Sequence, residues 1–149
     1  MKASTQVGEF KGLPVVKQGN RKIDLSLPAM RALAIDLKVY PLTDWKKAAV
    51  SDMISETWAD CFNSYGAAML NPDLDDAGKG KFFADSLAAG GLTNKLFKLC
   101  ETALDKSGGR FLTGAKMSMA DYCMASLIYD YYRNPGSPLA PAIGPVLDS

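Results

Sequence analysis

The segment around Ser118 constrains the fold more than any other part of the chain, because it encodes the start of a helix in its local sequence. Ser118 and Asp121 have the spacing of a capping box, in which each side chain takes the backbone N–H of the other residue. The Asp121 carboxylate also offsets the positive helix end. Met117 and Tyr122 stand where a hydrophobic staple would close over this box. We therefore predict a helix over about 119–132 that buries a set of side chains along one face: Tyr122, Cys123, Ala125, Ser126 and Tyr129.

Two more helical patterns precede this segment. Thr43 and Asp44 cap a run in which apolar residues recur every three or four positions as far as Leu70. Its apolar positions are Trp45, Ala48, Ala49, Met53, Ile54, Thr57, Trp58, Cys61, Phe62 and Tyr65. We assign the aromatic residues among them to the core rather than to a substrate pocket or a subunit interface. After a polar stretch at 72–80, a second pattern runs from Phe82 to Leu104 and is predicted to be loosened or kinked at Gly90–Gly91.

The N-terminal part reads as strand, turn, strand and helix. Residues 13–17 and 22–25 are short extended runs on either side of turn-forming residues 18–21, which predicts a hairpin. A helix then opens at Ser26, which we read as its N-cap. Pro41 blocks helix continuation, so we place a boundary there and predict two segments, 1–40 and 43–149.

Composition excludes several classes of function. The formal net charge is +1, with 17 basic and 16 acidic residues interspersed, which argues against nucleic-acid and membrane-surface binding. The chain has no histidine, which removes the commonest general base and metal ligand, and we predict no metal site. Cys61, Cys100 and Cys123 fall within apolar helical patterns, so we expect buried, reduced thiols. We find no run that would span a membrane and no signal peptide, and predict an intracellular protein, cytoplasmic by default, with an organelle as the alternative.

The capped segment with its Gly114 turn and Ala120–Asp121 pair resembles the C-terminal domain of cytosolic glutathione transferases. The strand, turn, strand and helix of residues 13–37 resemble the second half of the thioredoxin-like domain of sigma-type members. The resemblance implies a mainly α fold. It would consist of a glutathione-transferase C-terminal-type helical bundle preceded by a remnant of a thioredoxin-like domain, a β-hairpin plus a helix.

The same resemblance implies a set of glutathione-contacting residues: Lys2, Leu13, Pro14 and Ser26. Pro14 corresponds to the cis-proline of the family, Ser26 to the serine that holds the γ-glutamyl group, and Lys2 to a lysine that contacts the glycine carboxylate. Ser26 is equally well read as a helix cap alone. One position departs from the family pattern, since Leu25 stands where the family has a glutamine, and a leucine provides none of the hydrogen bonds of an amide.

Two functions follow from the resemblance. Family members begin with a strand-helix-strand unit that carries the thiolate-stabilising residue, and the resemblance starts after this unit, so we predict no catalytic residue. The first hypothesis is a non-catalytic glutathione-transferase-like protein that acts as a structural or interaction subunit. The alternative is an incomplete chain of an active sigma-like transferase that conjugates glutathione to electrophiles. A peroxidase or isomerase using Cys61 or Cys123 is disfavoured, because neither cysteine has a cationic sequence neighbour.

Such a helical bundle and two-stranded remnant would expose apolar surface, which predicts that other protein chains cover it. We expect an obligate complex, either with copies of the same chain or, preferentially, with other protein subunits. Contacts are expected at residues 13–37 and in the proline-rich tail 135–145.

Overall fold

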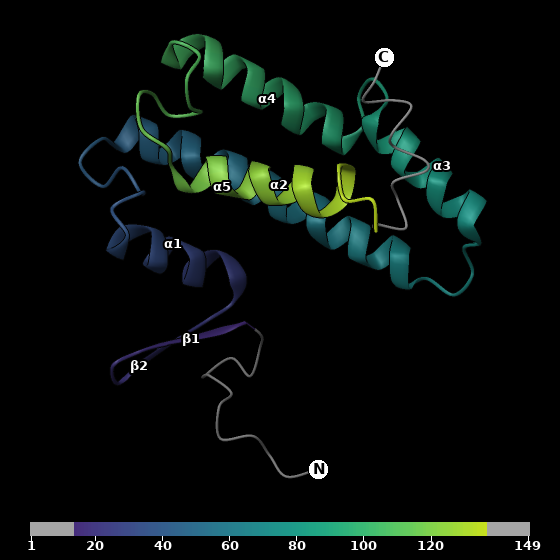
Figure 1. Cartoon of the computed structure of the whole chain (residues 1–149), viewed down its shortest axis with the longest axis horizontal. Helices are drawn as coiled ribbons and strands as arrows, with labels where there is room; N and C mark the ends of the chain where they lie inside the picture. The colour runs from purple at the N-terminus through teal and green to yellow at the C-terminus, as the bar shows by residue number, and fades with distance from the viewer. Residues whose placement is uncertain (1–13, 137–149) are drawn as a thin grey trace.

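The computed structural model describes residues 14–136, and these form a mainly helical fold with one hairpin (Figure 1). The predictions for Lys2, for Leu13 and for most of the 135–145 tail therefore lie outside the described residues. The elements in chain order are β1 (Val15–Gln18), β2 (Arg21–Asp24), α1 (Ser26–Asp36), α2 (Trp45–Leu70), α3 (Asp76–Leu87), α4 (Leu92–Ser107), α5 (Met119–Ser126) and the π-helix η1 (Leu127–Tyr132). The predicted fold class is confirmed.

The hairpin forms as the sequence predicts. Its two strands pair antiparallel, with Val15 opposite Asp24 and Gln18 opposite Arg21. Gly19 occupies the turn with φ of 58°, a conformation that glycine adopts without steric cost. Because the turn spans only two residues, its local chemistry is sufficient to set the register.

Helix α1 begins differently from the prediction. Leu25 occupies the N-cap position and Ser26 is the first helical residue, so the reading of Ser26 as the N-cap is wrong. Leu25 has φ of 70° and ψ of 145° and makes no side-chain capping bond. The helix ends in a Schellman motif, in which Val39 donates its N–H to Ala34 and Lys38, with φ of 58°, donates to Ile35.

Helix α2 is the central element of the fold. Its N-cap Asp44 accepts a hydrogen bond of 3.2 Å from the Lys47 N–H, as the sequence predicts. The buried face includes Ile54, Trp58, Cys61 and Tyr65, which confirms these four positions of the predicted stripe. The predicted stripe is too wide, because four of its members are exposed: Trp45, Ala49, Met53 and Phe62.

The second helical pattern is two helices rather than one kinked helix. Helix α3 begins earlier than predicted, inside the polar stretch, because the Asp75 side chain accepts the Gly78 N–H at 2.7 Å and caps it. The break before α4 is complete, since Gly90 has φ of 86° and a Cβ at Gly91 would approach the Ser86 carbonyl oxygen to 2.3 Å. At the far end α4 stops at Gly108, which adopts the left-handed conformation.

The capping box at the start of α5 is present. Met117 and Tyr122, expected to close a staple over it, remain exposed. The helix continues from Leu127 as a π-helix, which carries more residues per turn and shifts which side chains face the core. As a result Tyr129 is 69% exposed, contrary to the prediction, and Tyr132 is buried in its place.

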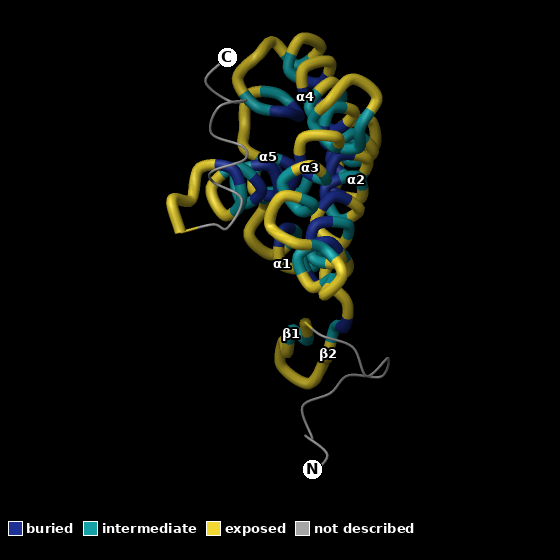
Figure 2. The backbone as a smooth tube through the Cα atoms, turned by 90° about the vertical axis from the view of Figure 1, so that its right-hand side faces the viewer, coloured by how far each residue is buried: buried dark blue, intermediate teal, exposed yellow. Residues whose placement is uncertain are grey.

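The core lies where α2 meets α3, α4 and α5, and α1 packs against one end of α2 (Figure 1). Figure 2 shows buried residues concentrated between these helices and a hairpin that is mostly exposed or half-buried. An ion pair fastens α1 to α2, since the Arg31 guanidinium lies 3.0 Å from Asp52, which also accepts the Tyr40 hydroxyl at 2.9 Å. Within residues 14–136, no helix is long and apolar enough to cross a membrane.

Candidate functional site

The open end of the hairpin brings together the described residues that the sequence predicts to contact glutathione. Val15 pairs with Asp24 at this end, so Pro14 and Leu25 are the next residues of the two chain segments, and Ser26 begins α1 directly after Leu25. Ser26 and Pro14 are both exposed. Unpaired N–H groups of a first helical turn favour an anionic group, so this end of α1 suits a carboxylate.

The backbone of Leu25, between the hairpin and α1, has a strained conformation. A positive φ with an extended ψ is a conformation that side chains rarely adopt, and it costs about 1 to 3 kcal/mol. Leu25 is also 46% exposed, so burial of its side chain does not fully offset that cost. Its side chain offers only hydrocarbon to a ligand at Pro14 and Ser26.

The cysteines do not form a reactive centre. Cys61, Cys100 and Cys123 are buried and reduced, as predicted. Burial raises the pKa of all three thiols, that of Cys100 to about 12, so the nucleophilic thiolate is disfavoured. None of the hydrogen-bonding neighbours is a base, because Cys61 accepts from the Thr93 hydroxyl and the Cys123 thiol donates to the Ser55 hydroxyl.

A buried hydroxyl cluster was missed by the sequence analysis. The Tyr65 hydroxyl bonds to those of Thr93 and Tyr132, and Thr93 in turn lies 2.7 Å from the Ser86 hydroxyl. Burial raises the pKa of Tyr65 and of Tyr132, so both remain protonated near neutral pH. The hydroxyls satisfy one another inside the core, which ties α2, α3, α4 and η1 together. No periodicity signals such a cluster, because its members come from four separate elements.

A cleft of about 620 Å³ lies between α4 and the α5–η1 helix. Its walls are mainly apolar, and two of the polar groups that reach it are already engaged. Asp121 binds Ser118 and Leu112, and Tyr132 binds Tyr65. Both groups therefore already take part in internal hydrogen bonds of the fold.

A second apolar feature lies between α1 and α5 and is called here the α1–α5 groove. It has a volume of about 160 Å³ and is lined by Met30, Leu33, Ala34, Leu37, Val39, Met119 and Tyr122. Leu33, Leu37 and Tyr122 are exposed along it, and Leu37 most of all, at 71%. The Met119 N–H donates to the Val39 carbonyl at 3.0 Å, which fixes the floor of the groove.

Comparison with models of known protein families shows which family the chain belongs to. The model for the glutathione S-transferase C-terminal domain matches residues 59–143, which is more than half of the chain. The chain belongs to this glutathione S-transferase family. A search of curated proteins finds no match.

The family match begins within α2, so the hairpin and α1 lie ahead of it. It includes the capping box of α5 and the hydroxyl cluster. The thioredoxin-like nature of residues 1–40, the domain boundary near Pro41 and the glutathione contacts stay predictions. Among the described residues, no group of three or more acidic, cysteine or histidine side chains is arranged to hold a metal ion.

Proposed function

We propose that this glutathione-transferase-like protein is a non-catalytic interaction subunit that associates through the α1–α5 groove. The observation that carries the proposal is the exposure of Leu33, Leu37 and Tyr122 along one groove. A contiguous apolar surface of this kind is typical of a protein contact. The buried cysteines, whose thiols have raised pKa values, support the absence of thiol catalysis.

The occupant we propose is a second copy of this chain rather than the other subunits preferred from the sequence, because the exposed Leu37 and the groove belong to one surface patch that can pair with itself. Leu37 follows the last residue of α1 at the rim of the groove, and its side chain is mostly exposed. In a two-fold dimer the same patch faces itself, so each Leu37 would insert into the groove of the other copy. Leu33 lies one turn earlier on α1 and extends the apolar contact along the helix.

Sedimentation equilibrium tests this proposal. We expect the parent chain to be dimeric at micromolar concentrations and Leu37→Glu to be monomeric, because the substitution places a charge in an apolar contact. Leu70→Glu is the matched control, since Leu70 is also highly exposed but lies at the far end of α2. A monomeric parent chain, or a dimer that tolerates Leu37→Glu, would overturn the proposal.

The alternative function, glutathione conjugation, is favoured by the exposed Ser26 at the α1 N-terminus beside Pro14. Calorimetric titration with glutathione tests it. Binding that Ser26→Ala weakens would support a retained glutathione site. Leu25→Gln offers a gain-of-function arm, since it restores the amide of the resembled family and should strengthen binding if the site exists.

A further inference from the structure

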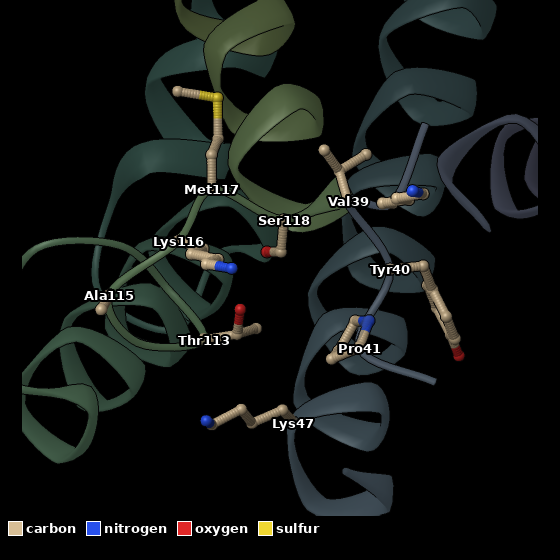
Figure 3. Close-up of a pocket in the computed structure, with 10 residues that line it drawn as sticks. Val39, Tyr40, Pro41, Lys47, Thr113, Ala115, Lys116, Met117 and Ser118 are labelled. Carbon is tan, nitrogen blue, oxygen red and sulfur yellow. The ribbon is translucent and has the colours of Figure 1, made fainter. Parts of the chain in front are cut away.

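A cavity of about 300 Å³, shown in Figure 3, has no residue of the hairpin among its lining side chains. It forms where the connection 38–41, the first turn of α2 and the loop 113–118 before α5 meet. The hydrogen bond from Met119 to the Val39 carbonyl holds the connection against the start of α5. We call it the lysine cavity, because Lys38, Lys47 and Lys116 line it.

The charged residues that line the lysine cavity are all lysines. No acidic residue is among its lining side chains. Lys47 has a partner, Asp44, at 3.4 Å, but Lys38 and Lys116 make no ion pair with any residue of the described range 14–136. A neighbouring cavity of about 350 Å³ shares Lys47 and adds Lys46 and Lys106. The lysines together create a positive potential that favours anions.

Thr113 gives a second, independent reason to expect a ligand in the cavity. Thr113 as a whole residue is only 8% exposed, and its hydroxyl makes no hydrogen bond to any part of the chain that the structure describes. Figure 3 shows this hydroxyl pointing into the cavity toward the side chain of Lys116. The hydroxyl of Ser118, by contrast, donates to Asp121 at 2.7 Å and is engaged. The Thr113 hydroxyl is therefore free to bond to a ligand in the cavity, and an acceptor with several oxygens can bind it and the Lys116 ammonium group together.

The rest of the wall is apolar. Val39, Pro41 and Met117 line the cavity beside the lysines. A ligand that matches both parts has a multivalent oxyanion and a small apolar body. Lysine binds phosphate as a point charge, and exposed lysines adapt to a tetrahedral group. We propose that the lysine cavity binds a small organic phosphate, with Lys47, Lys116 and Thr113 holding the phosphoryl oxygens and the apolar wall holding the organic group.

Isothermal titration of the full chain tests this with three probes: phenyl phosphate, inorganic phosphate and phenol. We expect phenyl phosphate to bind in the micromolar to millimolar range, inorganic phosphate to bind more weakly, and phenol not to bind. Binding of phenyl phosphate should weaken as sodium chloride is raised, because the lysines are exposed and screened. Equal binding of inorganic phosphate and phenyl phosphate would show that the apolar wall takes no part.

Matched variants locate the site. Lys116→Gln and Lys47→Gln should each weaken phenyl phosphate binding about tenfold, whereas Lys95→Gln, an exposed lysine on α4 outside both cavities, should leave it unchanged. Thr113→Val removes the hydroxyl at nearly constant volume and should also weaken binding. Far-UV circular dichroism confirms that the lysine variants fold, since they change only exposed side chains. Absence of binding to the parent chain, or binding that both lysine replacements leave intact, would overturn the proposal.

Discussion

Replacement of Asp121 by alanine tests how the bundle is held together at the start of α5. The Asp121 carboxylate accepts the Ser118 N–H and the Ser118 hydroxyl, each at 2.7 Å, and the Leu112 N–H at 2.9 Å. A hydrogen bond to a charged acceptor contributes about 1.5 to 3 kcal/mol, and the loss of a helix cap costs about 1 kcal/mol. Asp121 is only half-buried, so water replaces part of what is lost. We expect Asp121→Ala to lower the free energy of unfolding by about 3 kcal/mol.

Thermal denaturation followed by circular dichroism measures this loss. For a chain of this size, 3 kcal/mol corresponds to a fall in Tm of about 6 to 12 °C. Asp121→Asn keeps an acceptor oxygen without the charge, so its Tm should lie between those of the parent and the alanine variant. Asp105→Ala is the control, because Asp105 is an exposed carboxylate on α4 with no hydrogen bond or ion pair to the described residues. Equal melting temperatures for Asp121→Ala and Asp105→Ala would refute the reasoning.

Three further outcomes are expected. The chain should not accelerate conjugation of glutathione to an aryl halide, since Leu25 stands where the resembled family has a glutamine and offers glutathione no hydrogen bond, and turnover above the uncatalysed rate would contradict this. Tyr65→Phe should cost about 1 to 3 kcal/mol, because it leaves the Thr93 and Tyr132 hydroxyls short of a partner, and an unchanged urea midpoint would show that the cluster adds no stability. The free energy of unfolding should fall as pH rises from about 9 to 12, because the Cys100 thiol has a pKa of about 12 when folded and 9.0 when unfolded. Below pH 9 the thiol is protonated in both states and contributes no slope, and a Cys100→Ala variant should show a shallower decline in urea titrations at each pH.

Local sequence determined the elements whose contacts join near neighbours. The capping box was predictable because Ser118 and Asp121 are three residues apart. The hairpin was predictable because its turn spans only two residues. The stop of α4 followed from Gly108, which enters the left-handed conformation without strain.

Some local signals were present but were misread. The Asp75 cap lies within a stretch that looked like a polar loop, so the start of α3 was missed. The pair at 90–91 was expected to kink a helix, but a side chain at Gly91 would collide with the backbone of α3, and the helix ends there instead. Ser26 looked like a cap by residue type, although the backbone places Leu25 at that position.

Tertiary structure alone decided the rest. The π-helix at 127–132 places Tyr132 in the core and leaves Tyr129 exposed. A pattern of 3.6 residues per turn assumes an α-helix throughout, so it predicts the wrong tyrosine as buried. Lys47 lines the same cavity as Thr113 and Lys116 only because the start of α2 and the loop before α5 converge, although more than sixty residues of chain separate them. Sequence patterns report the neighbours of a residue along the chain, whereas a cavity depends on which distant segments the packed core brings together.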